Sequence, residues 1–262
     1  MPDRQALRQL ALVAARAAAD RVRTATASGR PLTAEVKGVS NYVTAVDREA
    51  ETAALSTLRQ ATPDIAVVGE ESGGSLDSRV WVVDPVDGTT NLICGFPVVG
   101  VSVALIEDGE PVVAAIVSAH TGDTWTAIAG EGAWDCRGRR LHLSGRQPTG
   151  VMATGVPART KRRLALYMPV FERALQRFDD LRRTGAATLD LAYTAAGTFD
   201  GFFELGLAIW DIAAGTLMVR EAGGVVTDWH GDQRAFFESG DIVAGRREWH
   251  EAMLDVITDA DA

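Results

Sequence analysis

Residues 81–91 have the sequence Trp-Val-Val-Asp-Pro-Val-Asp-Gly-Thr-Thr-Asn. The apolar run is typical of a buried strand that ends at Asp84, since Pro85 cannot donate a hydrogen bond to a sheet ladder. A tight turn of this spacing can aim Asp84 and Asp87 at one point and free the carbonyl of Val86. The Gly-Thr-Thr-Asn that follows suits the first turn of a helix, whose N–H groups and positive dipole end favour a phosphate.

Two other segments also place a carboxylate at the end of an apolar strand or the start of a helix. Residues 67–72 are Val-Val-Gly-Glu-Glu-Ser, and residues 207–215 are Leu-Ala-Ile-Trp-Asp-Ile-Ala-Ala-Gly. Taken singly, the first is typical of a solvated loop and the second of an acid in a first helical turn. Together with the central segment they form a set of carboxylates: Glu70, Asp84, Asp87 and Asp211.

These four carboxylates predict a metal site. They are hard oxygen donors with no nearby His or Cys, which suits Mg²⁺, with Mn²⁺ as a substitute, and argues against zinc or copper. Carboxylates brought together repel one another without cations. Two cations bridged by one Asp would neutralise them and clamp both sides of an in-line phosphoryl displacement.

The overall charge bears on the partners. The chain has 262 residues, with 26 Lys or Arg against 35 Asp or Glu, a formal net charge of −9. Such a chain should repel nucleic acid and anionic membranes, so neither is an expected partner. A phosphate substrate needs a local positive charge, and a bound divalent cation is the obvious source.

The N-terminus and the cysteines favour a cytoplasmic protein. The apolar run at residues 10–15 ends at Arg16, which is too short for a signal-peptide core or a membrane span. Cys94 and Cys136 offer neither a disulfide framework nor a thiolate metal spacing. We therefore expect a chain that is neither anchored nor exported.

Periodicity predicts the remaining elements. One amphipathic helix covers about the first 25 residues, and Thr44 caps a second helix with Asp47 at its third position. Strands are predicted at 65–69, 80–84, 98–107, 111–119, 123–129 and 140–143, with a Gly-rich turn at 130–133. Later strands (around 152, and at 199–205, 225–228 and 241–244) alternate with helices (164–178, 186–197, 209–222 and 248–257). This pattern predicts two layered sheets with helices between and outside them, in one domain with a soft boundary near residue 150.

Several stretches, in this order, resemble the inositol monophosphatase family of metal-dependent sugar phosphatases. Its two signatures match Asp-Pro-Val-Asp-Gly-Thr-Thr-Asn at 84–91, and Trp-Asp-Ile-Ala-Ala-Gly at 210–215 with Glu-Ala-Gly-Gly at 221–224. Lys37, residues 41–47 and residues 182–187 match as well. The resemblance implies a layered αβαβα sandwich, of mixed α+β and α/β class, as in inositol monophosphatase and fructose-1,6-bisphosphatase. It makes residues 1–150 a metal-binding lobe and residues 151–262 a substrate and C-terminal lobe of one phosphatase domain.

The resemblance also implies the roles of the acidic residues. Glu70, Asp84 and the Val86 carbonyl would hold a first Mg²⁺. The second would be held by Asp84, Asp87 and Asp211, and two or three ions are expected in all. Glu70 and Thr89 would position the attacking water, with Asp47 hydrogen-bonded to Thr89. Inhibition by lithium and a homodimer are implied too.

Substrate contacts follow from the same resemblance. The backbone N–H groups of Gly88 and Thr89 would bind the phosphate, and Lys37 lies on a loop that closes near the metals in relatives. Arg182 would orient Glu204 or an acid of a partner subunit, although an exposed ion pair explains it equally well. The leaving alcohol would be recognised by Asp87, Gly185, Ala186, Ala187, Glu204 and Asp211.

The choice of substrate is less determined than the chemistry. The leading prediction is myo-inositol monophosphate or a related polyol or sugar phosphate. Ala208, where many inositol-type members have His or Arg, and the short segment 71–81 weaken that choice. Fructose 1,6-bisphosphate (with Arg182 or Arg183 as a second phosphate pocket), histidinol phosphate and 3′-phosphoadenosine 5′-phosphate are rivals within the superfamily. A metal- and phosphate-binding regulatory module with little turnover is the alternative of another class.

Overall fold

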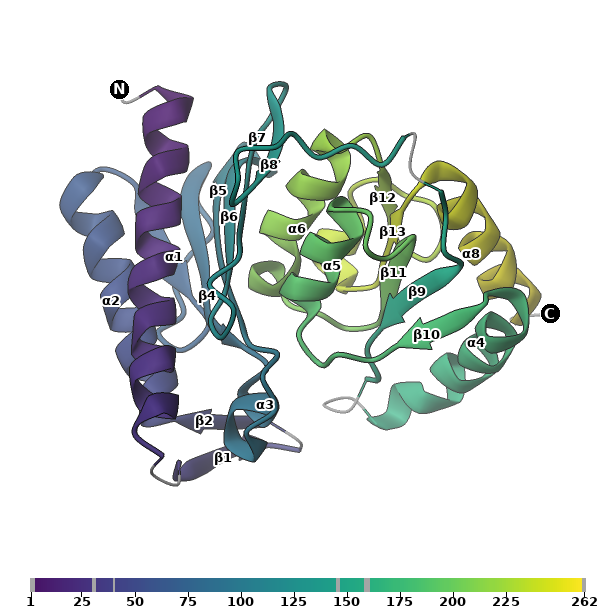
Figure 1. Cartoon of the computed structure of the whole chain (residues 1–262), viewed down its shortest axis with the longest axis horizontal. Helices are drawn as coiled ribbons and strands as arrows, with labels where there is room; N and C mark the ends of the chain where they lie inside the picture. Colours follow the sequence, from purple (N-terminus) through teal and green to yellow (C-terminus); the bar gives the residue numbers. More distant parts are fainter. Residues whose placement is uncertain (1–2, 30–31, 40, 145–146, 158–160, 261–262) are drawn as a thin grey trace.

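The computed structural model describes residues 3–29, 32–39, 41–144, 147–157 and 161–260. Within these residues the chain forms five layers, in the order helices, sheet, helices, sheet, helices (Figure 1). The helices are α1 (Arg4–Ala27), α2 (Ala45–Ala61), α3 (Thr89–Cys94), α4 (Leu164–Arg177), α5 (Ala187–Ala195), α6 (Ile209–Glu221), α7 (Phe236–Ser239) and α8 (Arg247–Ala260), with the 3₁₀ turn η1 (Lys161–Arg163) before α4. The layered αβαβα prediction is confirmed.

The strands form three sheets. A two-stranded sheet pairs β1 (Ala34–Gly38) with β2 (Asn41–Thr44). The six-stranded sheet has the order β3 (Ala66–Gly69), β4 (Arg79–Asp87), β5 (Gly100–Glu107), β6 (Glu110–Ser118), β7 (Thr124–Ile128) and β8 (Gly132–Asp135). The five-stranded sheet has the order β10 (Asp180–Arg182), β9 (Val151–Thr154), β11 (Gly201–Glu204), β13 (Ile242–Gly245) and β12 (Val225–Thr227).

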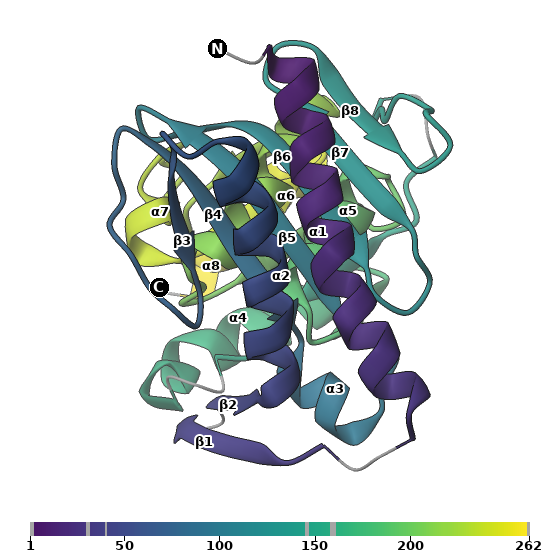
Figure 2. The same ribbon diagram turned by 90° about the vertical axis from the view of Figure 1, so that its left-hand side faces the viewer.

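The six-stranded sheet is buried on both faces, which explains why its strands are continuously apolar rather than alternating. α1 and α2 lie across one face (Figure 2), and α5 and α6 lie against the other. Alternate residues of a strand point to opposite faces. Trp81 and Val83 accordingly pack with the α1–α2 side, whereas Val80 and Val82 pack with the α5–α6 side.

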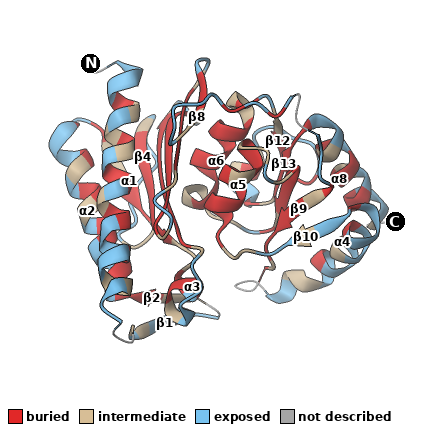
Figure 3. Cartoon of the chain, viewed as in Figure 1, coloured by how far each residue is buried: buried red, intermediate tan, exposed pale blue. Residues whose placement is uncertain are grey.

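The outer helices are amphipathic for the same reason. α1 buries a stripe of small residues between Leu7 and Val22, and its other side faces solvent (Figure 3). Asp3 caps this helix by accepting a hydrogen bond from the Ala6 N–H at 2.7 Å. On the far side of the molecule, α4 and α8 cover the second sheet with a core that includes Tyr167, Phe203 and Met253.

The structure also corrects some predicted elements. β4 does not stop at Asp84 but continues to Asp87. The turn after β7 is shorter than predicted, because β8 already begins at Gly132. Residues 140–143 form no strand, and only Arg140 makes an isolated bridge, to Trp134. The short strands β1, β2 and β10 lack the apolar alternation that would have revealed them.

The soft boundary near residue 150 falls between β8 and β9, which belong to different sheets. α5 and α6 contact both sheets, and the division into a metal-binding and a substrate lobe stays a prediction. Among the described residues, no helix combines the length and the apolar composition of a membrane span.

Candidate active site

A β-bulge near the end of β4 aims two carboxylates the same way. Asp84 pairs with Ser102 of β5, and Asp87 pairs with Gly100, so three steps on β4 match two steps on β5. In a regular strand, residues three apart point to opposite faces. The extra residue of the bulge changes that parity and brings both side chains to the α5–α6 side of the sheet. The Val86 N–H donates to Asp84 Oδ1 at 3.0 Å and stabilises the bend.

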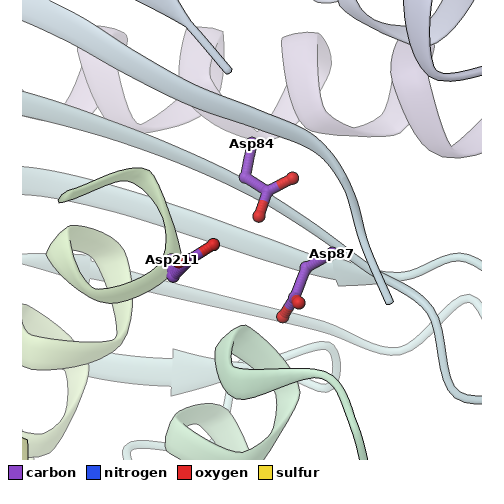
Figure 4. A group of neighbouring side chains, drawn as sticks. All are labelled: Asp84, Asp87 and Asp211. Carbon is purple, nitrogen blue, oxygen red and sulfur yellow. The ribbon is translucent and has the colours of Figure 1, made fainter. Parts of the chain in front are cut away.

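The third carboxylate comes from the second half of the chain. Asp211 lies in the first turn of α6, where one of its oxygens, Oδ2, accepts a hydrogen bond from the Ala208 N–H at 2.7 Å. Asp84, Asp87 and Asp211 each offer an oxygen, and these oxygens lie within 4.8 Å of one another (Figure 4). Asp211 therefore does two things at once: it caps a helix and joins the carboxylates of β4.

The electrostatics of this cluster favour a cation. Asp84 is 1% exposed, and burial raises the pKa of its carboxyl well above the usual value, with further increases from the charges of Glu70, Asp87 and Asp211. Its Oδ2 atom is buried and receives no N–H or O–H hydrogen bond from the described residues. Buried oxygens of this kind are suitable ligands for a hard divalent ion, so these residues fit the Mg²⁺ that was predicted.

Glu70 lies at the edge of this group. It follows β3, which pairs in parallel with β4, and the Glu70 N–H donates to the carbonyl of Val83 at 3.2 Å. It is not one of the three residues within 4.8 Å, yet among neighbouring charges its carboxylate has the largest effect on the pKa of Asp84. The parallel pairing thus brings Glu70 beside the β4 carboxylates.

A hydrogen-bonded chain joins Thr89 to the start of α2. The Thr89 hydroxyl donates to Asp47 Oδ1 at 2.9 Å, and it also lies 3.2 Å from the carbonyl oxygen of Val86. Asp47 Oδ2 accepts from both the hydroxyl of Thr44, at 2.5 Å, and its N–H, at 2.9 Å. All of these side chains are buried. The predicted cap of α2 and the predicted Asp47–Thr89 contact are therefore one structure.

A cavity of about 160 Å³ lies beside the carboxylates. Of the predicted site residues, it is lined by Asp87, Gly88, Thr89, Gly185, Ala187, Glu204 and Asp211. Larger hollows of about 480 and 580 Å³ beside β7 and β8 are lined by none of the predicted site residues. We place the site at the smaller cavity, because the buried acids converge there.

Glycines allow the walls of this cavity to approach closely. Gly88 has φ 94°, and a Cβ there would lie 2.9 Å from the carbonyl oxygen of Val98. A Cβ on Gly155, which also lines the cavity, would lie 2.0 Å from the carboxyl of Glu204. A side chain at Gly155 would displace the Glu204 carboxyl, which lines the cavity, and one at Gly88 would displace the backbone at Val98.

Glu204, at the end of β11 in the five-stranded sheet, has a carboxyl with a shifted pKa. Burial raises the pKa of the Glu204 carboxyl well above its usual value, and the charges of Asp190, Asp211 and Asp87 raise it further. Arg183 opposes this shift and lines the cavity. A carboxyl in this position can accept hydrogen bonds from hydroxyl groups when ionised and donate one when protonated.

Three predicted substrate residues lie away from the cavity lining. Arg182 forms an exposed ion pair with Asp180 at 2.5 Å, so Arg183 is the arginine of this segment that reaches the cavity. Lys37 forms an ion pair with Glu71. Ala186 is buried at the start of α5. Their roles in binding stay predictions.

The predicted site omits several residues that line the cavity. Tyr42 of β2 and Arg183 both line the cavity. Arg183 was named only as an alternative to Arg182 for a second phosphate pocket, and Tyr42 only within the family resemblance at residues 41–47.

Hydrogen bonds fasten the two halves of the chain at the site. Asp87 Oδ2 accepts from the N–H and the hydroxyl of Thr188, each at 2.7 Å. The Asn91 side-chain amide donates to the carbonyls of Val98, at 2.8 Å, and Thr184, at 2.9 Å. Residues from both sheets are thereby held around one cavity.

Comparisons with known proteins agree with this geometry. The model of the Inositol monophosphatase family matches residues 3–261. Nus factor SuhB of Pseudomonas aeruginosa is 40% identical over 262 residues, covering 97% of this chain and 96% of that protein.

Solved structures show the same arrangement of the chain. The extragenic suppressor protein suhB of Bartonella henselae is similar with a TM-score of 0.90 at 35% identity, over 96% of this chain and 98% of that one. The Thermotoga maritima IMPase is similar with a TM-score of 0.84 at 29% identity, over 95% of each chain.

Proposed function

We propose that this chain, which belongs to the inositol monophosphatase family, is a magnesium-dependent phosphatase that hydrolyses the phosphate monoester of a small polyol or sugar. The observation that supports this most is the meeting of Asp84, Asp87 and Asp211 within 4.8 Å, beside the Thr89–Asp47 pair. Myo-inositol monophosphate is the first substrate to test.

The metal ions would be held by oxygens of the first half of the chain and of α6. The proposed ligands are the carboxylates of Glu70, Asp84, Asp87 and Asp211 and the carbonyl of Val86. When bound, Mg²⁺ would offset the negative charge of the phosphate and make a nearby water more acidic. Two or three ions, with Mn²⁺ as a substitute, are part of the proposal.

The hydroxyl of Thr89 would orient the attacking water. Because this hydroxyl donates to Asp47 Oδ1, its oxygen lone pairs are left to accept a hydrogen bond from water. The carboxylate of Glu70 would then take the proton as the water attacks phosphorus, the bond from phosphorus to the ester oxygen would break, and the leaving alkoxide would take a proton from solvent. Backbone N–H groups of Gly88 and Thr89 would hold the phosphate oxygens.

The size and lining of the cavity support a small leaving alcohol. Its volume of about 160 Å³ lies well below that of pockets for drug-sized ligands. Glu204, Gly185 and Ala187 line it, and the carboxyl of Glu204 would bond ring hydroxyls. Fructose 1,6-bisphosphate and histidinol phosphate are the alternative substrates.

Phosphate release with and without Mg²⁺ tests the proposal. The four substrates to compare, at identical Mg²⁺, are inositol 1-phosphate, fructose 1,6-bisphosphate, histidinol phosphate and 3′-phosphoadenosine 5′-phosphate. We expect Mg²⁺-dependent release that is fastest for the inositol ester and is inhibited by lithium. No release from any of them would refute the enzymatic proposal, and release without divalent ions would refute the metal site.

A second candidate is a regulatory module that binds metal and phosphate with little turnover. The name Nus factor, carried by a relative that is 40% identical, is the observation in its favour. The Thr89–Asp47 pair favours the enzyme, since binding alone does not need an oriented hydroxyl.

A homodimer also remains part of the proposal, and light scattering of the purified protein tests it.

A further inference from the structure

The turn that carries Glu70 is held by a buried carboxylate from another element. Glu51 of α2 is 4% exposed. Its Oε2 accepts a hydrogen bond from the Glu71 N–H at 2.8 Å, and its Oε1 accepts one from the Ser72 N–H at 2.9 Å. We propose that Glu51 is a positioning residue, which fixes Glu70 where it can bind metal. This inference rests on the proposed function.

The fit between Glu51 and the turn is close. A Cβ on Gly69 would lie 2.4 Å from Glu51 Oε2, so position 69 must be glycine for the carboxylate to reach the two N–H groups. Gly69 and Gly73 close the turn through backbone hydrogen bonds of 3.4 and 2.9 Å. Glu70 therefore follows Gly69, which packs against the Glu51 carboxylate. It precedes Glu71 and Ser72, whose N–H groups both donate to that carboxylate.

One helix sets the position of both halves of the site. Asp47 and Glu51 are four residues apart on α2 and so lie on one face of the helix. Asp47 binds Thr89, after β4, whereas Glu51 binds the turn after β3. The spacing between the proposed base and the proposed water-orienting hydroxyl is thus fixed by one rigid turn of helix rather than by two independent loops.

A carboxylate is specifically needed at this position. Two N–H donors require two acceptor oxygens, which Glu provides. Gln offers one oxygen, and its NH₂ group would face the other N–H without a bond. Glu51→Gln should therefore release one side of the turn with almost no change in volume.

The experiment is a calorimetric titration of Mg²⁺ into the metal-free protein without substrate, together with the Mg²⁺ activation curve for phosphate release. We expect Glu51→Gln to weaken Mg²⁺ binding by about 10- to 100-fold, the range seen when a group that orients a metal ligand is lost. The Mg²⁺ concentration for half-maximal activity should rise by the same factor, with kcat at saturating Mg²⁺ falling much less. Glu49→Gln, the same change at an exposed position of α2, should leave both values unchanged.

Glu51→Asp keeps two acceptor oxygens on a shorter side chain, and we expect it to recover part of the lost affinity. If Glu51→Gln does not fold, this variant alone decides, by weakening Mg²⁺ binding several-fold. A folded Glu51→Gln that binds Mg²⁺ as the unsubstituted protein does would overturn the inference and leave the proposed function standing. Absence of Mg²⁺ binding and turnover in the unsubstituted protein would overturn both.

Discussion

The β5–β6 hairpin and the bulged end of β4 belong to one sheet but have opposite energetic roles. β5 and β6 are buried almost throughout, and side chains such as Val103 and Leu105 pack against the helices. The end of β4 instead buries Asp84 next to other carboxylates, and its raised pKa means that the ionised form is disfavoured there. The first region stabilises the fold, whereas the second destabilises the metal-free fold in exchange for a binding site.

The sharpest test of this contrast is Asp84→Asn. We expect turnover to fall by about a thousandfold, since the Asp84 carboxylate would bind both proposed metal ions. The stabilisation of transition-state charge by those ions is worth several kcal/mol. The metal-free variant should melt a few degrees higher than the unsubstituted protein, because a buried charge has been removed. Phosphate release and thermal denaturation measure the two effects. Near-normal turnover would contradict the proposed site.

Truncation in the hairpin should give the reverse pattern. Leu105 is fully buried on the face away from the carboxylates, and Leu105→Ala should lower the free energy of unfolding by about 3 kcal/mol. The Mg²⁺ concentration for half-maximal activity should not change at a temperature where the variant is folded. Denaturant unfolding and an Mg²⁺ activation curve check this, and a shift in the activation curve would show that the two regions are coupled.

The two adjacent arginines differ in environment, because one lines the cavity and the other lies at the surface. Arg183 lines the cavity and Arg182 does not. Arg183→Ala should raise KM by about tenfold, the loss expected of a hydrogen bond to a charged group. Arg182→Ala should change KM and the free energy of unfolding little, by at most about 0.5 kcal/mol. Equal effects of the two variants would contradict the placement of Arg183.

The smallest expected effect is a pH dependence of the metal-free stability. A carboxyl whose pKa is raised in the folded state binds more protons folded than unfolded, so unfolding becomes easier as the pH rises from its usual pKa through the raised one. The stability gained by Asp84→Asn should therefore be near zero at about pH 4, close to the usual pKa, and grow toward neutral pH. Paired denaturation curves across this range, without metal, measure the difference. A stability gain that stays constant with pH would show that the pKa of the Asp84 carboxyl is not raised by folding.

Local rules explain which parts were predicted from the sequence. The cap of α2 by Thr44 and Asp47 depends on residues a few positions apart, and so does the apolar run before Asp84. The proposed metal ligands were identified from the combination of three acidic segments and from the family resemblance, since each segment taken singly has an ordinary structural explanation. The short edge strands were missed, because strands of three to five residues with exposed side chains carry almost no periodicity.

The sequence by itself determined the residue types of the site, the elements that carry them and the family to which the chain belongs. Only the tertiary structure decided which groups meet. The extra residue in β4 puts Asp84 and Asp87 on one side, and sheet packing brings Asp211 of α6 to them. The physical reason is that strand pairing, bulges and helix packing act between residues distant in the chain, and no local pattern records the partner.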